Sequence, residues 1–103
     1  MSSDVDKKKA HFGIALRAIR KSKDLRMHEV YSKATGRTYY SALELGHKSP
    51  TLAKIDEIAA ALEVHPLALL LLTYAQSSDD SMLQLLLEAR MDLAALGLWT
   101  EEK

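Results

Sequence analysis

Basic side chains, which could bind phosphate, are concentrated in the first half of this 103-residue chain, whose formal net charge is zero. Residues 1–55 contain twelve lysines and arginines against five acidic residues, a net charge of +7. Residues 56–103 contain two against nine, a net charge of −7. Such a division is expected when a basic nucleic-acid-binding face is joined to an acidic portion that does not bind. The alternative is an uneven distribution by chance in a short chain.

Side chains that catalyse reactions or bind metals do not cluster in the sequence. The four histidines are 17 to 19 residues apart, without the close pairing that metal ligands on one helical face require. They are His11, His28, His47 and His65. The sequence also has no glycine-rich phosphate loop, paired-carboxylate pocket or nucleophile elbow. We therefore expect neither catalysis, nor a metal ion, nor a cofactor.

Length and composition indicate one small domain, with at most an appended element. The absence of cysteine rules out disulfides and cysteine-bound metal, and it fits a reducing cytosol. The longest apolar run, residues 67–72, is far shorter than the roughly 20 residues of a membrane span, and no signal segment opens the chain. We expect a soluble, cytoplasmic protein.

Helices must position the basic residues, and the clearest helix signals begin at residue 37. Tyr40 and Leu43 are three residues apart and can face inward on one short helix. Gly46 can supply the left-handed backbone that ends this helix. A polar turn then follows, and we expect this turn to be the functional centre of the chain.

A second helix is predicted after Pro50, which prevents continuation of the first, with Thr51 as its N-cap. Apolar residues then recur at spacings of three, four and three, which places one apolar stripe on a helix face. The stripe consists of Leu52, Ile55, Ala59 and Leu62. We expect this stripe to be buried in the core.

The ordered pattern resembles the lambda-repressor-like (XRE family) helix-turn-helix domain. In that family a recognition helix ends in Glu-x-Gly and is followed by basic residues, a proline and a helix with spaced Leu, Ile, Ala and Leu residues. The matching residues here are Glu44-Leu45-Gly46, His47-Lys48, Ser49-Pro50-Thr51 and the apolar stripe. The resemblance extends from about residue 12 to about residue 70, and the last third of the chain lies outside it.

The resemblance implies an all-α fold, a five-helix lambda-repressor-like DNA-binding domain to which a C-terminal oligomerisation helix is added here. We expect a flexible N-terminal arm at residues 1–6, the DNA-binding domain at 7–75 and the self-association helix at 76–103. Apolar spacing and helix-end signals predict the helices themselves. They are expected at about residues 8–22, 27–35 and 37–45, then from Thr51 to about residue 63, and from Pro66 onward.

By the same resemblance, the first turn and the next exposed turn of the helix at 37–45 face the DNA major groove, which is about 12 Å wide. Arg37 can bond bidentately to guanine, Thr38 offers a hydroxyl and a methyl group, and Ala42 can contact a thymine methyl. The base-facing candidates are Arg37, Thr38, Ser41 and Ala42.

Phosphate contacts are expected around this helix, and the candidates are Arg17, Arg20, Tyr39, His47, Lys48 and Ser49. For Tyr39, packing against the core is the alternative, and the run Lys7-Lys8-Lys9 either reaches phosphate or is solvated. The resemblance also implies that Arg20 pairs with Glu44, and the guanidinium could hold the carboxylate while presenting a spare donor to phosphate. The alternative is two ordinary surface charges.

The sequence departs from the family in the predicted second helix. Arg26-Met27 stands where the family has Ser/Thr-Gln, so a common N-cap and a common polar DNA contact are missing. Tyr31 replaces a small residue, and the chain between residues 25 and 44 is about one residue shorter than in the family. We expect the fold to be kept and the angle of the recognition helix to differ.

The last third of the chain is predicted to mediate self-association. In the fifth helix, the inner side is expected to hold Leu67, Leu70, Leu71 and Tyr74, with Leu69 and Leu72 pointing elsewhere. In residues 81–96, apolar residues alternate at spacings of four and three, as in a heptad seam, beside a second stripe. The expected interface is Leu69, Leu72, Met82, Leu86, Ala89, Leu93, Leu96 and Trp99. The alternative is an intramolecular cap over the core.

These observations predict a bacterial, sequence-specific, double-stranded-DNA-binding transcriptional regulator, associated with the nucleoid. It would act as a homodimer, or as a tetramer, on an inverted repeat whose half-sites are about one helical turn, ~10 bp, apart. The alternative is a protein-interaction or antitoxin-like module whose leucine-rich carboxyl half binds a protein partner and whose DNA binding is weak or partner-dependent. Met27 and the short turn favour the alternative, and the +7 half argues against it.

Overall fold

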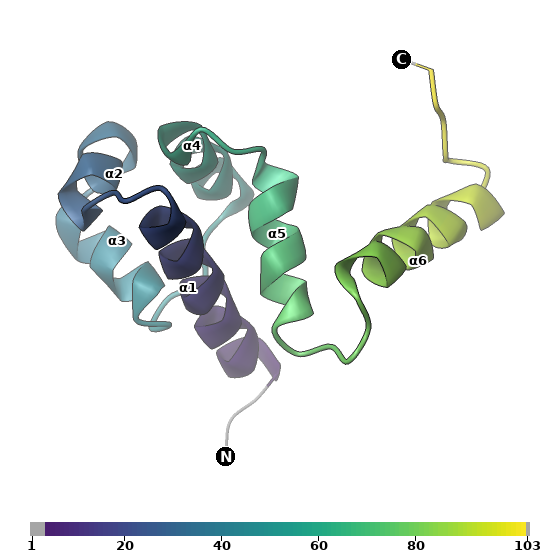
Figure 1. The fold of residues 1–103 in the computed structure, drawn as a ribbon, viewed down its shortest axis with the longest axis horizontal. Coiled ribbons are helices and arrows are strands. Elements are labelled where there is room, and N and C mark those ends of the chain that lie inside the picture. The colour runs from purple at the N-terminus through teal and green to yellow at the C-terminus, as the bar shows by residue number, and fades with distance from the viewer. Residues whose placement is uncertain (1–3, 103) are drawn as a thin grey trace.

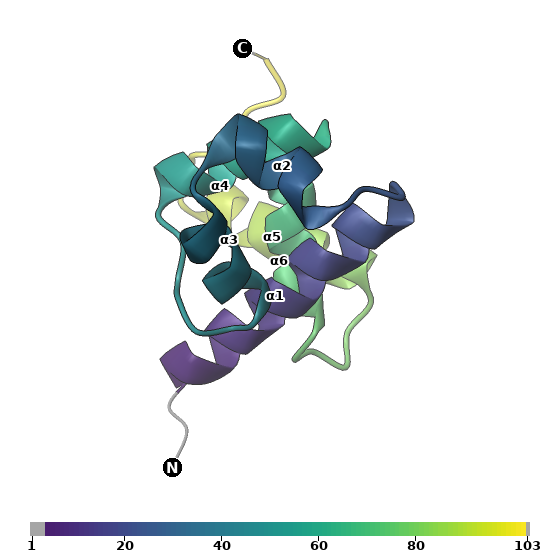
Figure 2. The same cartoon turned by 90° about the vertical axis from the view of Figure 1, so that its left-hand side faces the viewer.

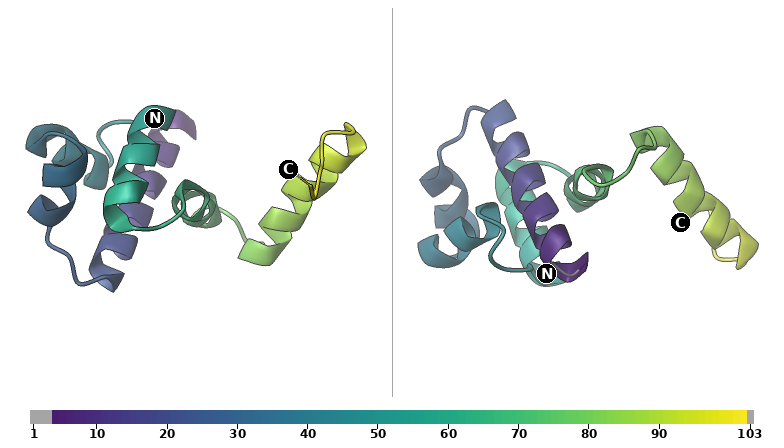
Figure 3. Two further views of the ribbon diagram at one scale, coloured as in Figure 1. Left: turned by 90° about the horizontal axis from the view of Figure 1, so that it is seen from above. Right: turned by 90° about the horizontal axis from the view of Figure 1, so that it is seen from below.

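The computed structural model describes residues 4–102, which form six helices and no strand (Figure 1). The helices are α1 (Asp4–Ser22), α2 (Met27–Ala34), α3 (Arg37–Glu44), α4 (Leu52–Leu62), α5 (Pro66–Ala75) and α6 (Met82–Ala95). Helices α1 to α5 pack into one cluster, and α6 projects from it beyond α5 (Figure 3). The predicted all-α class is confirmed.

The core lies where helices α1 to α5 meet. Its buried apolar side chains are Phe12, Ala15, Leu16, Val30, Tyr40, Leu43, Ile55, Ile58, Ala59, Leu62 and Leu69. Removal of these side chains from water is the main favourable term for folding. Within the described residues no single helix could cross a membrane; α4 and α5 reach that length and composition only together, and they are bent by 106°.

Helix α1 begins at Asp4, earlier than the predicted start at residue 8. Asp4 and Asp6 lie in the first turn, where carboxylates interact favourably with the positive end of the helix dipole. Residues 4–6, which were predicted to belong to a flexible arm, are therefore helical, and residues 1–3 lie outside the described part of the chain.

The end of α3 follows the prediction. Gly46 has a φ of +78°, in the left-handed region. The N–H of Gly46 donates to the carbonyl of Leu43 (3.1 Å), and the N–H of His47 donates to that of Ala42 (2.9 Å). This pattern satisfies the last carbonyls of the helix. It also lets the turn approach α1, because a β carbon on Gly46 would lie 2.9 Å from the α carbon of Ala10.

Helix α4 is capped as predicted, because the Thr51 hydroxyl accepts a hydrogen bond from the N–H of Lys54 (3.1 Å). Its predicted stripe is correct except for Leu52, whose side chain is 77 % exposed. Leu52 is the first residue of the helix, and helical side chains point back toward the N-terminus, away from the core here. Ile58, which the stripe did not include, is completely buried.

Helix α5 begins at Pro66 and Leu70 packs against the core, both as predicted, but Leu67 and Tyr74 were wrongly placed on its inner face. Leu69 and Thr73 are buried, whereas Leu67 and Tyr74 are 65 % and 55 % exposed. Leucines occupy nearly every side of this helix, so the spacing of apolar residues does not show which side faces the core. Thr73 can be buried because its hydroxyl donates to the carbonyl of Leu69 (2.7 Å). Leu69 is therefore a core residue and not an oligomer contact, and Leu72 is partly buried against the core.

Helix α6 has no buried residue. Ser81 caps it by accepting from the N–H of Gln84 (3.0 Å), while Ser78 accepts from the N–H of Asp80 in the preceding turn. The exposed large apolar residues of α6 and its tail are Met82, Leu83, Leu86, Leu87, Met91, Leu93, Leu96, Leu98 and Trp99. Helix α6 packs mainly on α5 and projects away from the α1 to α5 cluster (Figures 1 and 3), so it does not cover the core as an intramolecular cap would.

Candidate nucleic-acid interface

The outer face of α3 carries the four predicted base-facing residues. Arg37 and Thr38 are exposed and Ser41 and Ala42 are partly exposed, whereas Tyr40 and Leu43 of the same helix are buried. One shallow depression of about 320 Å³ is lined by Arg37, Thr38, Ser41, Ala42, Leu45 and His47. The helix therefore presents these four side chains together on one surface. Figure 2 views the molecule from the side on which α2 and α3 lie.

Two further depressions adjoin this face and carry most of its positive charge. One lies between α2 and α3 and is lined by Arg20, Arg26, Met27, His28, Tyr31, Arg37 and Ser41. The other reaches α1 and is lined by Arg17, Arg20, Lys21, Met27, Ser41, Glu44 and Leu45. Because the three depressions share residues, they form one surface, which we call the α3 surface. It holds five lysine and arginine side chains and one carboxylate.

That one carboxylate, Glu44, is paired with Arg20 across α1 and α3. The Nε of Arg20 donates to Oε2 of Glu44 (2.6 Å) and Nη2 donates to Oε1 (3.0 Å). A third donor, Nη1, bonds to the carbonyl of Leu25 (2.9 Å). The pair is almost fully buried, with 10 % and 5 % of the two side chains exposed. The hydrogen bond to Glu44 raises the pKa of Arg20, so its charge is firmly held.

The predicted pair is thus present, and its geometry is bidentate, which fixes the two helices in orientation as well as in distance. With three donors in use and little exposed surface, Arg20 acts mainly as a structural residue. Its neighbour Arg17, by contrast, is exposed on the same surface.

Tyr40 lies beside this pair at the centre of α3. Its hydroxyl is buried, and no atom of the described residues meets it in hydrogen-bond geometry. Burial raises the pKa of the phenol, and the neighbouring carboxylate of Glu44 raises it further. The hydroxyl thus lies beside Glu44 and Arg20, but neither meets hydrogen-bond geometry with it within residues 4–102.

Residues 16–69, which run from the middle of α1 into α5, match the helix-turn-helix family. The chain belongs to the XRE-type helix-turn-helix family. The matched segment includes α2, α3 and α4 in full, so the α3 surface lies within it. The resemblance predicted from Glu44-Leu45-Gly46 and the residues after it is confirmed, and the family is one of DNA-binding transcriptional regulators.

Two solved structures share the fold of this helix-turn-helix protein. Both are crystal structures of the clp gene regulator ClgR from Corynebacterium glutamicum. One has a TM-score of 0.66 and 22 % sequence identity, and it covers 71 % of this chain and 96 % of the ClgR chain. The other has a TM-score of 0.64 and 24 % identity, with 93 % and 96 % covered. No match was found among curated proteins.

Some residues of the α3 surface in this helix-turn-helix protein were not predicted from the sequence. They are Lys21, Arg26, His28 and Leu45. Arg26 precedes α2 where the family has a capping side chain, and here Glu29 accepts from the N–H of Arg26 instead (3.1 Å). Glu29, three residues after Arg26, could have predicted this alternative cap, because a glutamate at that position can accept from the N–H of the N-cap residue. Leu45 gave no signal beyond its place next to Glu44.

The other predicted phosphate contacts lie near the turn after α3. Lys48 and Ser49 are exposed. Tyr39 is partly buried against the core, and the Nζ of Lys48 lies 5.7 Å from its ring centroid, so packing describes Tyr39 better than free exposure. His47 lines the depression on α3. Ser49 lines a different depression, shared with Lys8 and Lys9.

The lysine run of α1 already has partners within the described residues. The Nζ of Lys8 lies 4.1 Å from the ring centroid of Tyr74 and donates to the hydroxyl of Ser77 (3.4 Å). The Nζ of Lys9 lies 3.4 Å from a carboxylate oxygen of Asp6. The contacts of Lys8 tie the start of α1 to the end of α5, whereas the pair of Lys9 and Asp6 lies within α1.

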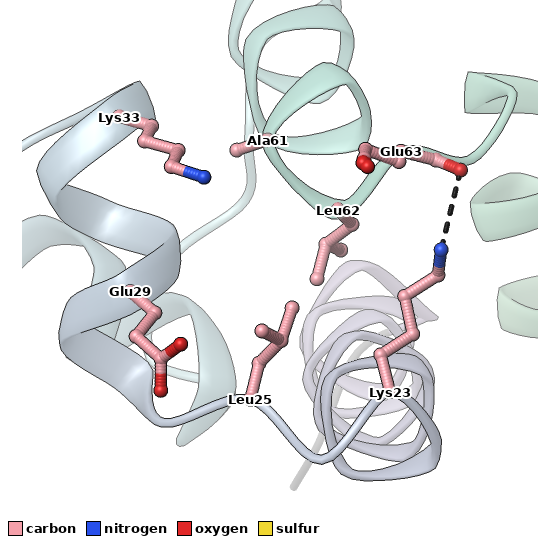
Figure 4. A pocket seen from close by; sticks show the side chains of 7 residues that line it. All are labelled: Lys23, Leu25, Glu29, Lys33, Ala61, Leu62 and Glu63. Carbon is pink, nitrogen blue, oxygen red and sulfur yellow. Dashed lines mark hydrogen bonds between the residues drawn. The ribbon is translucent and has the colours of Figure 1, made fainter.

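A separate depression of about 420 Å³ lies between α2 and the end of α4 (Figure 4). Lysines and glutamates both line it, and the Nζ of Lys23 donates to the carbonyl of Glu63 (3.4 Å). Leu25, Ala61 and Leu62 form its apolar wall. Across residues 4–102, no group of three histidine, cysteine or acidic residues could hold a metal ion. We assign no ligand to this depression.

Proposed function

We propose that this helix-turn-helix protein is a transcriptional regulator that binds a specific double-stranded DNA sequence through α3, as a homodimer on an inverted repeat. One observation carries this proposal. The exposed side chains of α3 lie between two depressions lined by arginine, and the only carboxylate of this surface is paired with Arg20. A surface of this kind has positive charge for phosphates and hydrogen-bonding groups for base edges.

In this proposal, phosphate and base contacts come from different residues. Arg17, Arg26 and Lys48 are exposed cations around α3, and they would supply salt-dependent affinity for any duplex. Arg37 would supply sequence discrimination, because its planar guanidinium matches the two acceptors of guanine in the major groove. Thr38 and Ser41 would add hydroxyl contacts to neighbouring bases.

The homodimer is proposed from the exposed apolar residues of α6. Leu86 and Leu93 are seven residues apart and lie on one stripe of a helix that has no buried residue. Helix α6 lies at the opposite end of the molecule from α2 and α3 (Figure 1). Association through α6 would therefore leave the α3 surface of both protomers free for DNA. A regulator of this kind would act on the nucleoid in the cytoplasm.

A second candidate function is a protein-interaction module, because the same apolar stripe would also fit a different protein chain. Met27 favours this candidate, since a partly buried methionine stands where a polar DNA contact would be expected. The clustering of arginines around α3 argues against it. The two candidates differ in whether DNA binding has sequence preference.

The test is selection of bound sequences from a random duplex pool at about 150 mM salt, with light scattering on the same protein. The proposal predicts an enriched inverted repeat and the mass of a dimer. Arg37→Ala should lose roughly 1–3 kcal/mol and relax the preference at one base pair, whereas Lys48→Ala should weaken all sequences about equally. A pool without enrichment, and binding that is lost at modest salt, would contradict the proposal and favour a protein partner.

A further inference from the structure

Leu45 is an apolar residue on a surface that is otherwise rich in arginine. Its side chain is 65 % exposed, whereas that of Leu43, two residues earlier, is completely buried. Leu45 lies at the end of α3 and lines the same depression as Arg37, Thr38 and Ala42. Leu45 is not a core residue of its own chain, so packing within the domain does not explain it.

The α3 surface has a hydrogen-bonding end and an apolar end. Arg37 and Thr38 lie in the first turn of α3, and Ala42 and Leu45 lie near its last turn, four and seven residues after Thr38. Residues at these spacings share one helix face. Arg37 and Leu45 are eight residues apart, which is roughly 12 Å along a helix and corresponds to about three base pairs. The two ends would therefore contact different base pairs of one half-site.

We propose that Leu45, together with Ala42, recognises the C5-methyl group of a thymine in the half-site. This inference rests on the proposed function. In the major groove thymine alone among the four standard bases presents a methyl group, and an aliphatic side chain is its natural partner. A leucine offers no hydrogen bond to a phosphate or to a base edge, so an apolar base group is the part of the DNA that it fits.

The test uses the operator obtained from the random pool. Each thymine of one half-site is replaced in turn by uracil, which removes only the methyl group and keeps the hydrogen-bonding edge. At one position, about three base pairs from the one read by Arg37, uracil should weaken binding by the wild type about fourfold, as expected for one buried methyl group. In Leu45→Ala, the same replacement should change binding less than twofold.

The matched control is Leu52→Ala, which removes another exposed leucine, outside the depressions of the α3 surface. It should discriminate thymine from uracil as the wild type does. Thermal unfolding of Leu45→Ala and Leu52→Ala checks that both variants are folded. The inference is wrong if no thymine replacement affects the wild type, or if Leu45→Ala discriminates as well as the wild type does. The proposed function is tested by the selection experiment itself, and it is contradicted if the random pool gives no preferred sequence.

Discussion

The backbone of Gly13 in α1 lies so close to the end of α3 that a β carbon on it would be 2.6 Å from the carbonyl oxygen of Glu44. The carbonyl of Leu43 would be 2.7 Å away. Seven residues after Gly13, Arg20 holds the side chain of the same Glu44. One face of α1 thus fixes α3 twice, by backbone approach and by a buried ion pair. The direction in which α3 presents Arg37 depends on both contacts.

Gly13→Ala should lower the free energy of unfolding by about 1–3 kcal/mol, the usual cost of an overpacked contact. The change would be stabilising in an open helix, since alanine is favoured over glycine there by about 1 kcal/mol. Gly36→Ala is the comparison, because a β carbon at Gly36 has no atom within 4 Å; Gly36 is the N-cap of α3, so this variant should lose at most about 1 kcal/mol. Urea denaturation of the two variants checks this. A Gly13→Ala protein as stable as the wild type would show that α1 can move away without cost.

The buried pair of Arg20 and Glu44 should contribute far more to the free energy of unfolding than an exposed ion pair with a similar N to O distance. Glu44→Ala leaves a buried guanidinium without its carboxylate, and we expect a loss of about 3–5 kcal/mol. Glu57→Ala is the control, since the pair of Lys54 and Glu57 has a distance of 2.9 Å but is exposed, and its loss should cost less than about 1 kcal/mol.

The double variant Arg20→Met/Glu44→Leu separates charge from packing in that experiment. Because it removes both buried charges, it should regain most of the stability lost in Glu44→Ala. The measurement is the denaturant midpoint of the wild type, of Glu44→Ala, of Glu57→Ala and of the double variant. Equal losses in Glu44→Ala and Glu57→Ala would mean that the buried pair is not the contact that holds α3 to α1.

Helix ends were the part of the fold that the sequence predicted best. Gly46, Thr51 and Pro66 each act through their own backbone or side chain within one turn, so their effect does not depend on distant packing. The partner of Glu44 could be predicted only from the family resemblance, because 24 residues separate it from Arg20.

Faces of helices without clear periodicity could not be predicted in the same way. Helix α5 is apolar nearly all round, and its buried face is set by contacts with α1 and α4 that leave Leu69 and Thr73 inside. Leu52 fits the spacing of the α4 stripe, but it lies at the end of the helix where the core does not reach. In the candidate site, the contribution of Arg26 comes from how α2 packs beside α3.

Tyr40→Phe should change the free energy of unfolding by no more than about 1 kcal/mol near neutral pH, because the buried hydroxyl lies beside Glu44 without meeting hydrogen-bond geometry. The pH dependence should also change. Burial holds the pKa of Tyr40 well above its ordinary value near 10, so above about pH 10 the unfolded chain loses a proton that the folded chain keeps. The wild type should therefore lose stability above that pH.

The difference in unfolding free energy between Tyr40→Phe and the wild type isolates this effect, because other groups that titrate at high pH are common to both proteins. That difference should be constant below about pH 9 and should grow in favour of Tyr40→Phe as the pH rises through 10 to 11. Denaturant melts across this range provide the measurement. A difference that stays constant would show that the phenol ionises as readily in the folded state as in the unfolded one.

Charges placed on α6 should separate the protomers without unfolding the domain. In Leu86→Glu/Leu93→Glu, two carboxylates replace exposed leucines of one stripe, so association through this stripe would bury them at a high cost. Light scattering should give a monomer mass, and the melting temperature of the domain should change little, because α6 has no buried residue. Binding to the full inverted repeat should weaken by at least about 100-fold, as each half-site then binds alone. Gln84→Glu, which adds a carboxylate at an exposed polar position, is the control. A dimer mass for the double variant would place the interface elsewhere.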